Sequence, residues 1–347
     1  MKNNTRESNM RKISRFCIIV AITVSIFFVS ACGNTKQNIE SPGKSEEGNT
    51  PQIQIVTTVF PLYDWTKAVV GDDPDFQVIL LAESGVDFHS FQPSTEDIMK
   101  IKKSDVFLYI GGVSDQWVSK VIEEQGSNDG ENISMVSALG DRVKSEDEEL
   151  ELGADSYNHE HQGGKTHEEE IDEHLWLSLK NAKIYVEKIC QVLSDRYPEK
   201  KDVFNENCSA YVQKLDQLDE QYQDAANSGS HKAVIVGDRF PFRYLLDDYG
   251  IQYFAAFPGC SSESEGSFEK IIWLAQKADQ LNVNKIIAIE GSTQTICNSI
   301  IENTEKKDQS VVVMNSMQQV SMKDIEGGEN YLKIMEENLE ALKEALN

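Results

Sequence analysis

Short apolar runs rich in β-branched residues alternate with segments of helical spacing along most of the chain. The predicted strands are residues 53–59, 76–81, 105–110 and 133–136 in the first half, and 233–237, 251–257, 285–289 and 311–314 in the second. The predicted helices are residues 61–70, 94–103, 115–124, 240–248, 267–281, 293–303 and 328–345. Because alternating strands and helices form parallel sheets with covered faces, we expect an α/β fold of two lobes, each with a roughly four-stranded parallel sheet flanked by helices.

A long helical stretch at about 179–226 separates the two sets of strands, with an interruption at Pro198. Its second part, 199–226, keeps apolar residues at helical spacing throughout. A helix of about 28 residues is roughly 40 Å long at 1.5 Å per residue, so it can join two lobes as a stiff strut. We therefore expect an N-terminal lobe at 53–198, a rigid linking helix at 199–230 and a C-terminal lobe at 231–347.

The first residues have the features of an export signal. Basic side chains precede the apolar run 16–31, which is short for a membrane span and ends in small residues before Cys32. This pattern resembles a bacterial lipobox, so residues 1–31 are predicted to be a lipoprotein signal peptide and Cys32 the lipidated residue. An ordinary cleaved signal is the alternative. The polar segment 32–52 contains Gly, Pro and Ser and is expected to be a flexible tether that holds the protein at the extracytoplasmic face of the cell membrane.

Composition and charge limit the classes of function that this protein can have. Of the 347 residues, 39% are hydrophobic and 26% charged, which excludes disorder of the whole chain. The formal net charge is −25, so the protein should repel nucleic acid and attract cations. The sequence contains no HExxH, GxSxG or P-loop motif. These observations favour a binding protein without catalytic activity.

Half of the six histidines lie in one acidic loop, residues 145–173. His159, His161 and His167 alternate there with carboxylates, and imidazole and carboxylate suit zinc and its neighbours in the first transition row. We therefore predict an auxiliary metal-gathering loop. A solvated acidic loop that contains three histidines by chance is the alternative.

Two further histidines lie where an α/β lobe binds ligands. His89 follows the strand 76–81 and precedes a helix start at Ser94, and ligands bind beyond the carboxyl ends of parallel strands. His174 lies between the acidic loop and the next helix, beside Trp176. Taken singly, each is more often a hydrogen-bonded structural residue than a ligand.

The order of the motifs resembles one family, the metal-binding lipoproteins of ABC transporters that import zinc, manganese or iron (cluster A-I, zinc-uptake-like). The matching segments are GVDFHSFQP (85–93), HEHQGGKTHEEE (159–170), DEHLWL (172–177) and GGENYLKIMEENLEAL (327–342). The resemblance implies two α/β lobes, a rigid linking helix, one metal ion in the cleft and delivery to an ABC permease. It also implies that His89 and His174 are the two ligands from the N-terminal lobe.

The C-terminal lobe departs from the family pattern. In GDRFPFRYL (237–245), Arg239 occupies the expected ligand position, and a guanidinium has no lone pair to offer. The second ligand segment, 311–321, has no carboxylate and offers only Ser316 and Gln318, both weaker donors. We therefore predict other carboxylates as ligands, in the order Asp238, Glu290, Glu263.

The resulting hypothesis is a monomeric solute-binding lipoprotein that captures Zn²⁺ and delivers it to an ABC permease. A manganese- or iron-binding homologue is an alternative, because a site of two histidines and several carboxylates would suit manganese. A surface adhesin is another, and a zinc hydrolase with an open coordination position is a third. The spacing of Cys190, Cys208, Cys260 and Cys297 selects no disulfide pairing.

Overall fold

The computed structural model describes residues 52–125, 130–146, 171–259 and 267–347. None of the helices in these ranges combines the length and the apolarity that crossing a bilayer requires. Several residues singled out from the sequence lie outside the described ranges: Cys32, His159, His161, His167, Cys260 and Glu263. The predicted signal peptide and nearly all of the predicted tether lie outside them as well.

The first half of the chain forms a four-stranded parallel sheet in the order β2-β1-β3-β4. Its strands are β1 (Ile53–Thr57), β2 (Phe76–Leu80), β3 (Val106–Tyr109) and β4 (Glu131–Ser134). Its helices are α2 (Phe60–Val70), α3 (Thr95–Lys103), α4 (Gln116–Gln125) and α5 (Met135–Leu139). Successive β1 side chains point to opposite faces, so Ile55 packs with α2 while Val56 packs with α3 and α4. Helices therefore cover both faces of this sheet.

The second half repeats this arrangement with the order β6-β5-β7-β8, again all parallel. The strands are β5 (Ala233–Phe240), β6 (Gln252–Pro258), β7 (Lys285–Ile289) and β8 (Ser310–Met314). The helices are α8 (Arg243–Asp248), α9 (Phe268–Leu281), α10 (Thr295–Asn303), α11 (Met322–Glu326) and α12 (Tyr331–Ala345). In each sheet, the strand that comes first in the sequence (β1 or β5) lies second in the spatial order of the strands. The predicted fold class, two α/β lobes with four-stranded parallel sheets, is confirmed.

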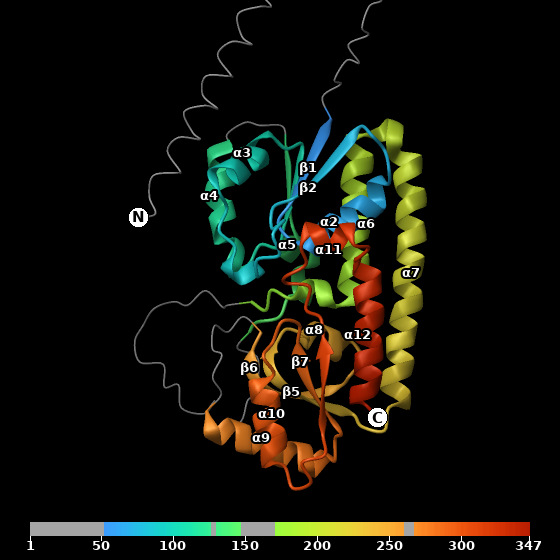
Figure 1. Cartoon of the computed structure of the whole chain (residues 1–347). Coiled ribbons are helices and arrows are strands. Elements are labelled where there is room, and N and C mark those ends of the chain that lie inside the picture. Colours follow the sequence, from blue (N-terminus) through green and yellow to red (C-terminus); the bar gives the residue numbers. More distant parts are fainter. Residues whose placement is uncertain (1–51, 126–129, 147–170, 260–266) are drawn as a thin grey trace, which may run out of the picture. The chain divides into compact units, whose positions relative to one another are not determined.

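Between the two sheets the chain forms two helices, α6 (Leu179–Arg196), which belongs to the N-terminal lobe, and the 28-residue α7 (Lys201–Ser228), which lies between the lobes. Pro198 opens the short turn η6 (Pro198–Lys200) that separates them, since proline cannot continue a helix. Helix α7 packs against α2 and α6 of the N-terminal lobe and against α12 of the C-terminal lobe (Figure 1). The Tyr222 hydroxyl donates to the Met335 carbonyl oxygen at 2.6 Å, which ties α7 to α12. The predicted long helix between the lobes is therefore present.

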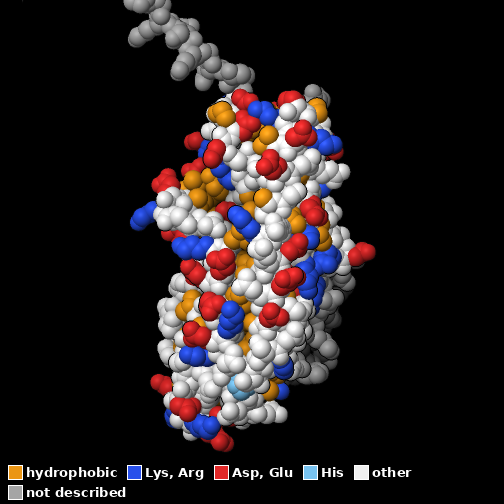
Figure 2. All heavy atoms as spheres, turned by 90° about the vertical axis from the view of Figure 1, so that its right-hand side faces the viewer, with side chains coloured by type: hydrophobic (Ala, Val, Ile, Leu, Met, Phe, Trp, Pro, Cys, Tyr) orange, Lys and Arg blue, Asp and Glu red, His pale blue; other side chains and the backbone are white. Residues whose placement is uncertain are grey.

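Helix α7 lies on the face that Figure 2 presents. Acidic and basic side chains are interspersed there, so this face offers no continuous basic strip.

Side chains from both lobes share the largest hydrophobic core. Trp176, in the short turn η5 (Leu175–Leu177), is fully buried in it, and its Nε1–H donates to the Ser316 carbonyl oxygen at 2.9 Å. The Tyr331 hydroxyl in turn donates to the Trp176 carbonyl oxygen at 2.7 Å. The segment that follows His174 is thus tied by two hydrogen bonds to the C-terminal lobe.

Several element boundaries differ from the prediction, and two of the differences have a clear local cause. The strand predicted at 133–136 ends at Ser134, because the Ser134 hydroxyl accepts the Ser137 N–H and caps α5. The helix predicted at 240–248 begins only at Arg243, because β5 continues to Phe240. The register between β5 and β6 shifts between Val236 and Arg239, so β5 has an irregularity at Gly237 and Asp238 before Arg239 pairs with Phe257.

Candidate metal-binding site

Two imidazoles from distant parts of the N-terminal lobe face each other. His89 lies in the short turn η1 (Phe88–Ser90) after β2, and His174 precedes η5. Their Nε2 atoms are 3.1 Å apart. In both places an aspartate two residues earlier accepts the histidine's own backbone N–H at 3.0 Å, Asp87 for His89 and Asp172 for His174. The repeated Asp-x-His spacing therefore gives both histidines the same hydrogen bond from their backbone to an aspartate.

A carboxylate orients the ring of His174. Its Nδ1 lies 2.8 Å from Asp172 Oδ1, and the imidazole side chain is fully buried. A carboxylate accepts hydrogen bonds, so Nδ1 carries the proton and Nε2 keeps its lone pair. Metal-binding histidines commonly have their second nitrogen held in this way.

His89 is held through Glu173. Its Nδ1 lies 2.9 Å from the Ser114 hydroxyl and 3.3 Å from Glu173 Oε2. Ser114 itself donates to both Glu173 oxygens, from its hydroxyl at 2.5 Å and its backbone N–H at 2.8 Å. Burial alone would raise the pKa of Glu173, but the hydrogen bonds from His89 and Ser114 lower it below its usual value. Glu173 therefore remains an anion that favours a proton on His89 Nδ1 and a free lone pair on Nε2.

The C-terminal lobe covers His174 from the other side. The side-chain amide of Gln318 lies against His174 Nε2, and within the described residues Gln318 Oε1 is buried without a hydrogen-bond partner. A Cβ on Gly259 would lie 2.8 Å from His174 Cε1, closer than real Cβ contacts. A residue without a side chain is therefore required at position 259 for this lobe to approach the ring.

Asp238 and Glu290, predicted as ligands, line a different cavity of about 200 Å³, whose lining also includes Arg239 but neither histidine. Glu290 accepts both the backbone N–H and the hydroxyl of Ser316, at 2.7 and 2.5 Å, and its burial raises its pKa. Asp238 accepts the Arg239 backbone N–H at 2.9 Å. Among residues 52–125, 130–146, 171–259 and 267–347, no three His, Cys, Asp or Glu side chains form a group that could hold a metal ion. The assignment of Asp238 and Glu290 stays a prediction.

Sequence reasoning did not assign a role to Asp172 or Glu173. The signal was available, because D-x-H occurs both at Asp87 and at Asp172. Gln318 was considered but ranked below the carboxylates, because an amide is a weaker donor. Its position next to His174 arises only when the C-terminal lobe folds.

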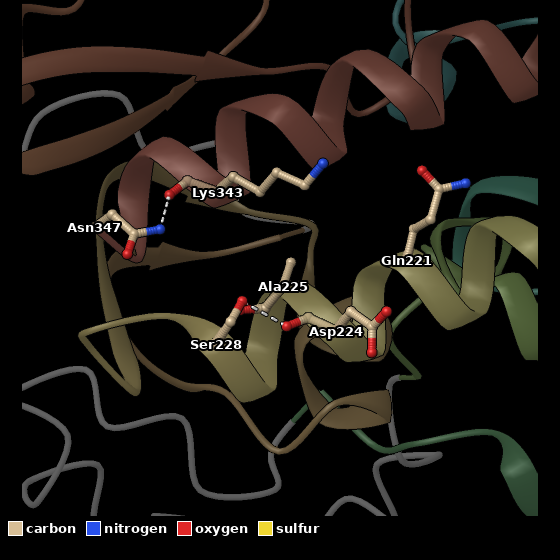
Figure 3. Close-up of a pocket in the computed structure, with 6 residues that line it drawn as sticks. All are labelled: Gln221, Asp224, Ala225, Ser228, Lys343 and Asn347. Atoms are coloured by element: carbon tan, nitrogen blue, oxygen red, sulfur yellow. Dashed lines mark hydrogen bonds between the residues drawn. The ribbon is translucent and has the colours of Figure 1, made fainter.

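A second cavity, of about 340 Å³, lies between the ends of α7 and α12 (Figure 3). Gln221, Asp224, Ala225, Ser228, Lys343 and Asn347 line it. The Ser228 hydroxyl donates to the Asp224 carbonyl oxygen at 2.7 Å, and Asn347 Nδ2 donates to the Lys343 carbonyl oxygen at 2.8 Å. The first bond lies within α7 and the second at the end of α12, so neither connects the two helices. None of the predicted site residues lines this cavity.

Two α/β lobes with parallel sheets, a long helix between them and two histidines that face each other define a solute-binding protein of the metal-uptake type. The family model "Zinc-uptake complex component A periplasmic" matches residues 55–345, so the chain belongs to that family. The resemblance inferred from the motifs is thereby confirmed.

Named relatives agree with this assignment. The chain is 33% identical over 338 residues to the zinc-binding lipoprotein AdcA of Streptococcus pneumoniae (strain ATCC BAA-255 / R6), a match that covers 96% of this chain and 61% of AdcA. It is 27% identical over 328 residues to the high-affinity zinc uptake system protein ZnuA of Bacillus subtilis (strain 168), covering 94% of this chain and 97% of that protein. The chain thus spans less than two thirds of the AdcA proteins that it matches.

Solved structures share the fold. The Zn(II)-bound ZnuA-like domain of S. pneumoniae AdcA superposes with a TM-score of 0.65 at 30% identity, covering 85% of this chain and 99% of that domain. The metal-dependent lipoprotein YcdH of B. subtilis gives a TM-score of 0.68 at 25% identity, with 85% and 99% covered.

Proposed function

We propose that this protein captures Zn²⁺ between the Nε2 atoms of His89 and His174. The observation that carries the proposal is their separation of 3.1 Å. Two nitrogen ligands at 2.0–2.1 Å from a tetrahedral zinc ion are about 3.3 Å apart, so an ion fits between these atoms with little movement of either ring. Both lone pairs already face the same point, because Asp172 and Glu173 hold the opposite ring nitrogens.

The donor set favours zinc over manganese. The nearest side chains around the two Nε2 atoms are neutral, two imidazoles and the amide of Gln318, whereas the nearby carboxylates bind the Nδ1 side. Imidazole suits zinc, and manganese prefers oxygen-rich sites. Manganese or iron remains the alternative cargo if Asp238 and Glu290 complete the site.

We further propose that the protein is a monomer anchored by lipidated Cys32 outside the cytoplasmic membrane, and that it delivers zinc to an ABC permease. Two findings support this role. The chain belongs to a family described as a component of zinc-uptake complexes, and its relative AdcA is named a lipoprotein. We propose no catalytic activity. A hydrolase needs a general base beside an open coordination position, but Asp172 and Glu173 are both engaged in orienting imidazoles.

The test is zinc competition titration of His89→Ala and His174→Ala against a chelator of known affinity. We expect each substitution to weaken zinc binding by at least about tenfold, since each removes one ligand. His231→Ala is the matched control, because His231 lies before β5 and hydrogen-bonds through its backbone to Leu346. Unchanged affinity in both site variants would remove the proposed site.

A deletion of residues 155–170 tests the role of the acidic loop separately from that of the tight zinc site. We expect slower capture or a narrower usable range of zinc concentration, while the tight affinity survives. Complete loss of tight binding would contradict this division of roles.

A further inference from the structure

Arg239 joins the two lobes at the edge of the histidine pair. Its Nη2 lies 3.0 Å from Asp87 Oδ2, with the two side chains 23% and 17% exposed. Asp87 belongs to the loop after β2, whereas Arg239 belongs to β5 of the other lobe, 152 residues later. The ion pair is therefore a long-range contact between lobes.

The other carboxylate oxygen of Asp87 holds His89. Asp87 Oδ1 accepts the His89 backbone N–H at 3.0 Å and caps the turn η1. Burial acts to raise the pKa of Asp87, but the charge and hydrogen bond of Arg239 together with the His89 N–H lower it overall. One carboxylate thus connects a cation of the C-terminal lobe with the backbone of a proposed zinc ligand.

We propose that Arg239 is a positioning residue of the zinc site. Through its ion pair with Asp87 it keeps the His89 turn against the C-terminal lobe, so that His89 Nε2 faces His174 Nε2. This inference rests on the proposed function, because it assigns a role to Arg239 in the same site. It also explains how a residue that cannot bind a metal serves at a position where the family resemblance implies a ligand.

Another ion pair between the lobes provides a comparison. Lys144 pairs with Asp247 at the start of the C-terminal lobe. The side-chain pair lies apart from both histidines, and Lys144 meets Asp172 through its backbone carbonyl oxygen, which accepts the Asp172 N–H. Lys144→Gln therefore removes a similar contact between lobes without touching the chain of contacts that leads to His89.

The experiment measures zinc affinity and thermal unfolding for Arg239→Gln, Asp87→Asn, the double variant and Arg239→Lys. Asp87→Asn keeps an oxygen that can accept the His89 N–H, so it removes the charge pair alone. We expect each of the two single neutral variants to weaken zinc binding about tenfold, the usual effect of losing a partner that orients a ligand. The double variant should be no weaker than either single one, because both break the same pair. Arg239→Lys should recover part of the affinity.

Lys144→Gln should leave zinc affinity unchanged, even if it lowers the unfolding temperature as much as Arg239→Gln does. Equal zinc affinity in Arg239→Gln and the wild type would overturn the positioning role. Additive losses in the double variant would overturn it as well, since they would mean that the two residues act separately. If His89→Ala loses zinc affinity but Arg239→Gln keeps it, the positioning role is refuted and the proposed function stands. If His89→Ala binds zinc as tightly as the wild type, the proposed function itself is refuted.

Discussion

Asp172 contacts His174 twice, through the ring Nδ1 at 2.8 Å and through the backbone N–H at 3.0 Å, both from the same oxygen. The aspartate therefore sets both the turn and the orientation of the ring.

We expect Asp172→Asn to weaken zinc binding about tenfold, because the amide lacks the negative charge that increases the basicity of the imidazole. Zinc competition titration measures this. Asp216→Asn, on the exposed surface of α7 where it pairs with Lys183, is the control and should bind zinc normally. An affinity for Asp172→Asn equal to that of the control would show that the carboxylate does not tune the ring.

Gln318 and the two predicted carboxylates compete for the role of donor from the C-terminal lobe. We expect Gln318→Leu to weaken zinc binding more than Asp238→Asn or Glu290→Gln, because the Gln318 amide lies against His174 Nε2 whereas the carboxylates line another cavity. The size of the effect should be about tenfold. Titration of the three variants in parallel decides between them. A larger loss in either carboxylate variant would support the ligand order predicted from the sequence.

The backbone at Gly259 approaches the His174 ring closely. In Gly259→Ala the new methyl would lie 2.8 Å from His174 Cε1, so the ring or the β6 end must move. We expect a zinc affinity reduced by about tenfold or more, as for other displaced ligands. Gly250→Ala is the control: its φ of 65° makes alanine cost about 1 kcal/mol of stability, but nothing lies within 4 Å of the new Cβ. Normal zinc binding in Gly259→Ala would contradict the close approach.

Asp64 should make stability depend on pH. Burial raises its pKa from 3.8 to about 6, although the Tyr211 hydroxyl, which donates to Asp64 at 3.0 Å, opposes this. Between these values the folded carboxyl keeps a proton that the unfolded one has lost, so stability falls as pH rises through this window. Relative to Asp64→Asn, the wild type should lose on the order of 2 kcal/mol between pH 4 and pH 7.

Urea unfolding of both proteins across that range measures the difference. The comparison cancels the other titrating groups, which the two proteins share. A constant difference would mean that Asp64 titrates as an exposed carboxyl does.

The fold could be predicted from the chain because its signals are local. The β-branched runs at 53–59 and 285–289 indicate buried parallel strands, and Pro198 marks the break between two helices. The ends of helices and strands are harder to predict where a polar residue changes the backbone path. Ser134 is an example, because it caps α5 at a position where the apolar run suggests a strand.

The histidine pair was predicted from its motifs, but its partners were not. The contact between Gln318 and His174 spans 144 residues, and that between Arg239 and Asp87 spans 152. No local pattern encodes contacts across such separations, which arise only when the two lobes pack together. Without those contacts, charged donors are the better prediction than neutral ones, and so Asp238 and Glu290 were placed above Gln318.

The two rings differ in access to solvent: the His89 side chain is 13% exposed, whereas that of His174 is fully covered. An arriving ion must then lose its first water molecules to His89 and reach His174 second, and a departing ion must leave in the reverse order. Substitutions at the outer imidazole should consequently change how fast the cargo is taken up, and those at the inner one how long it stays.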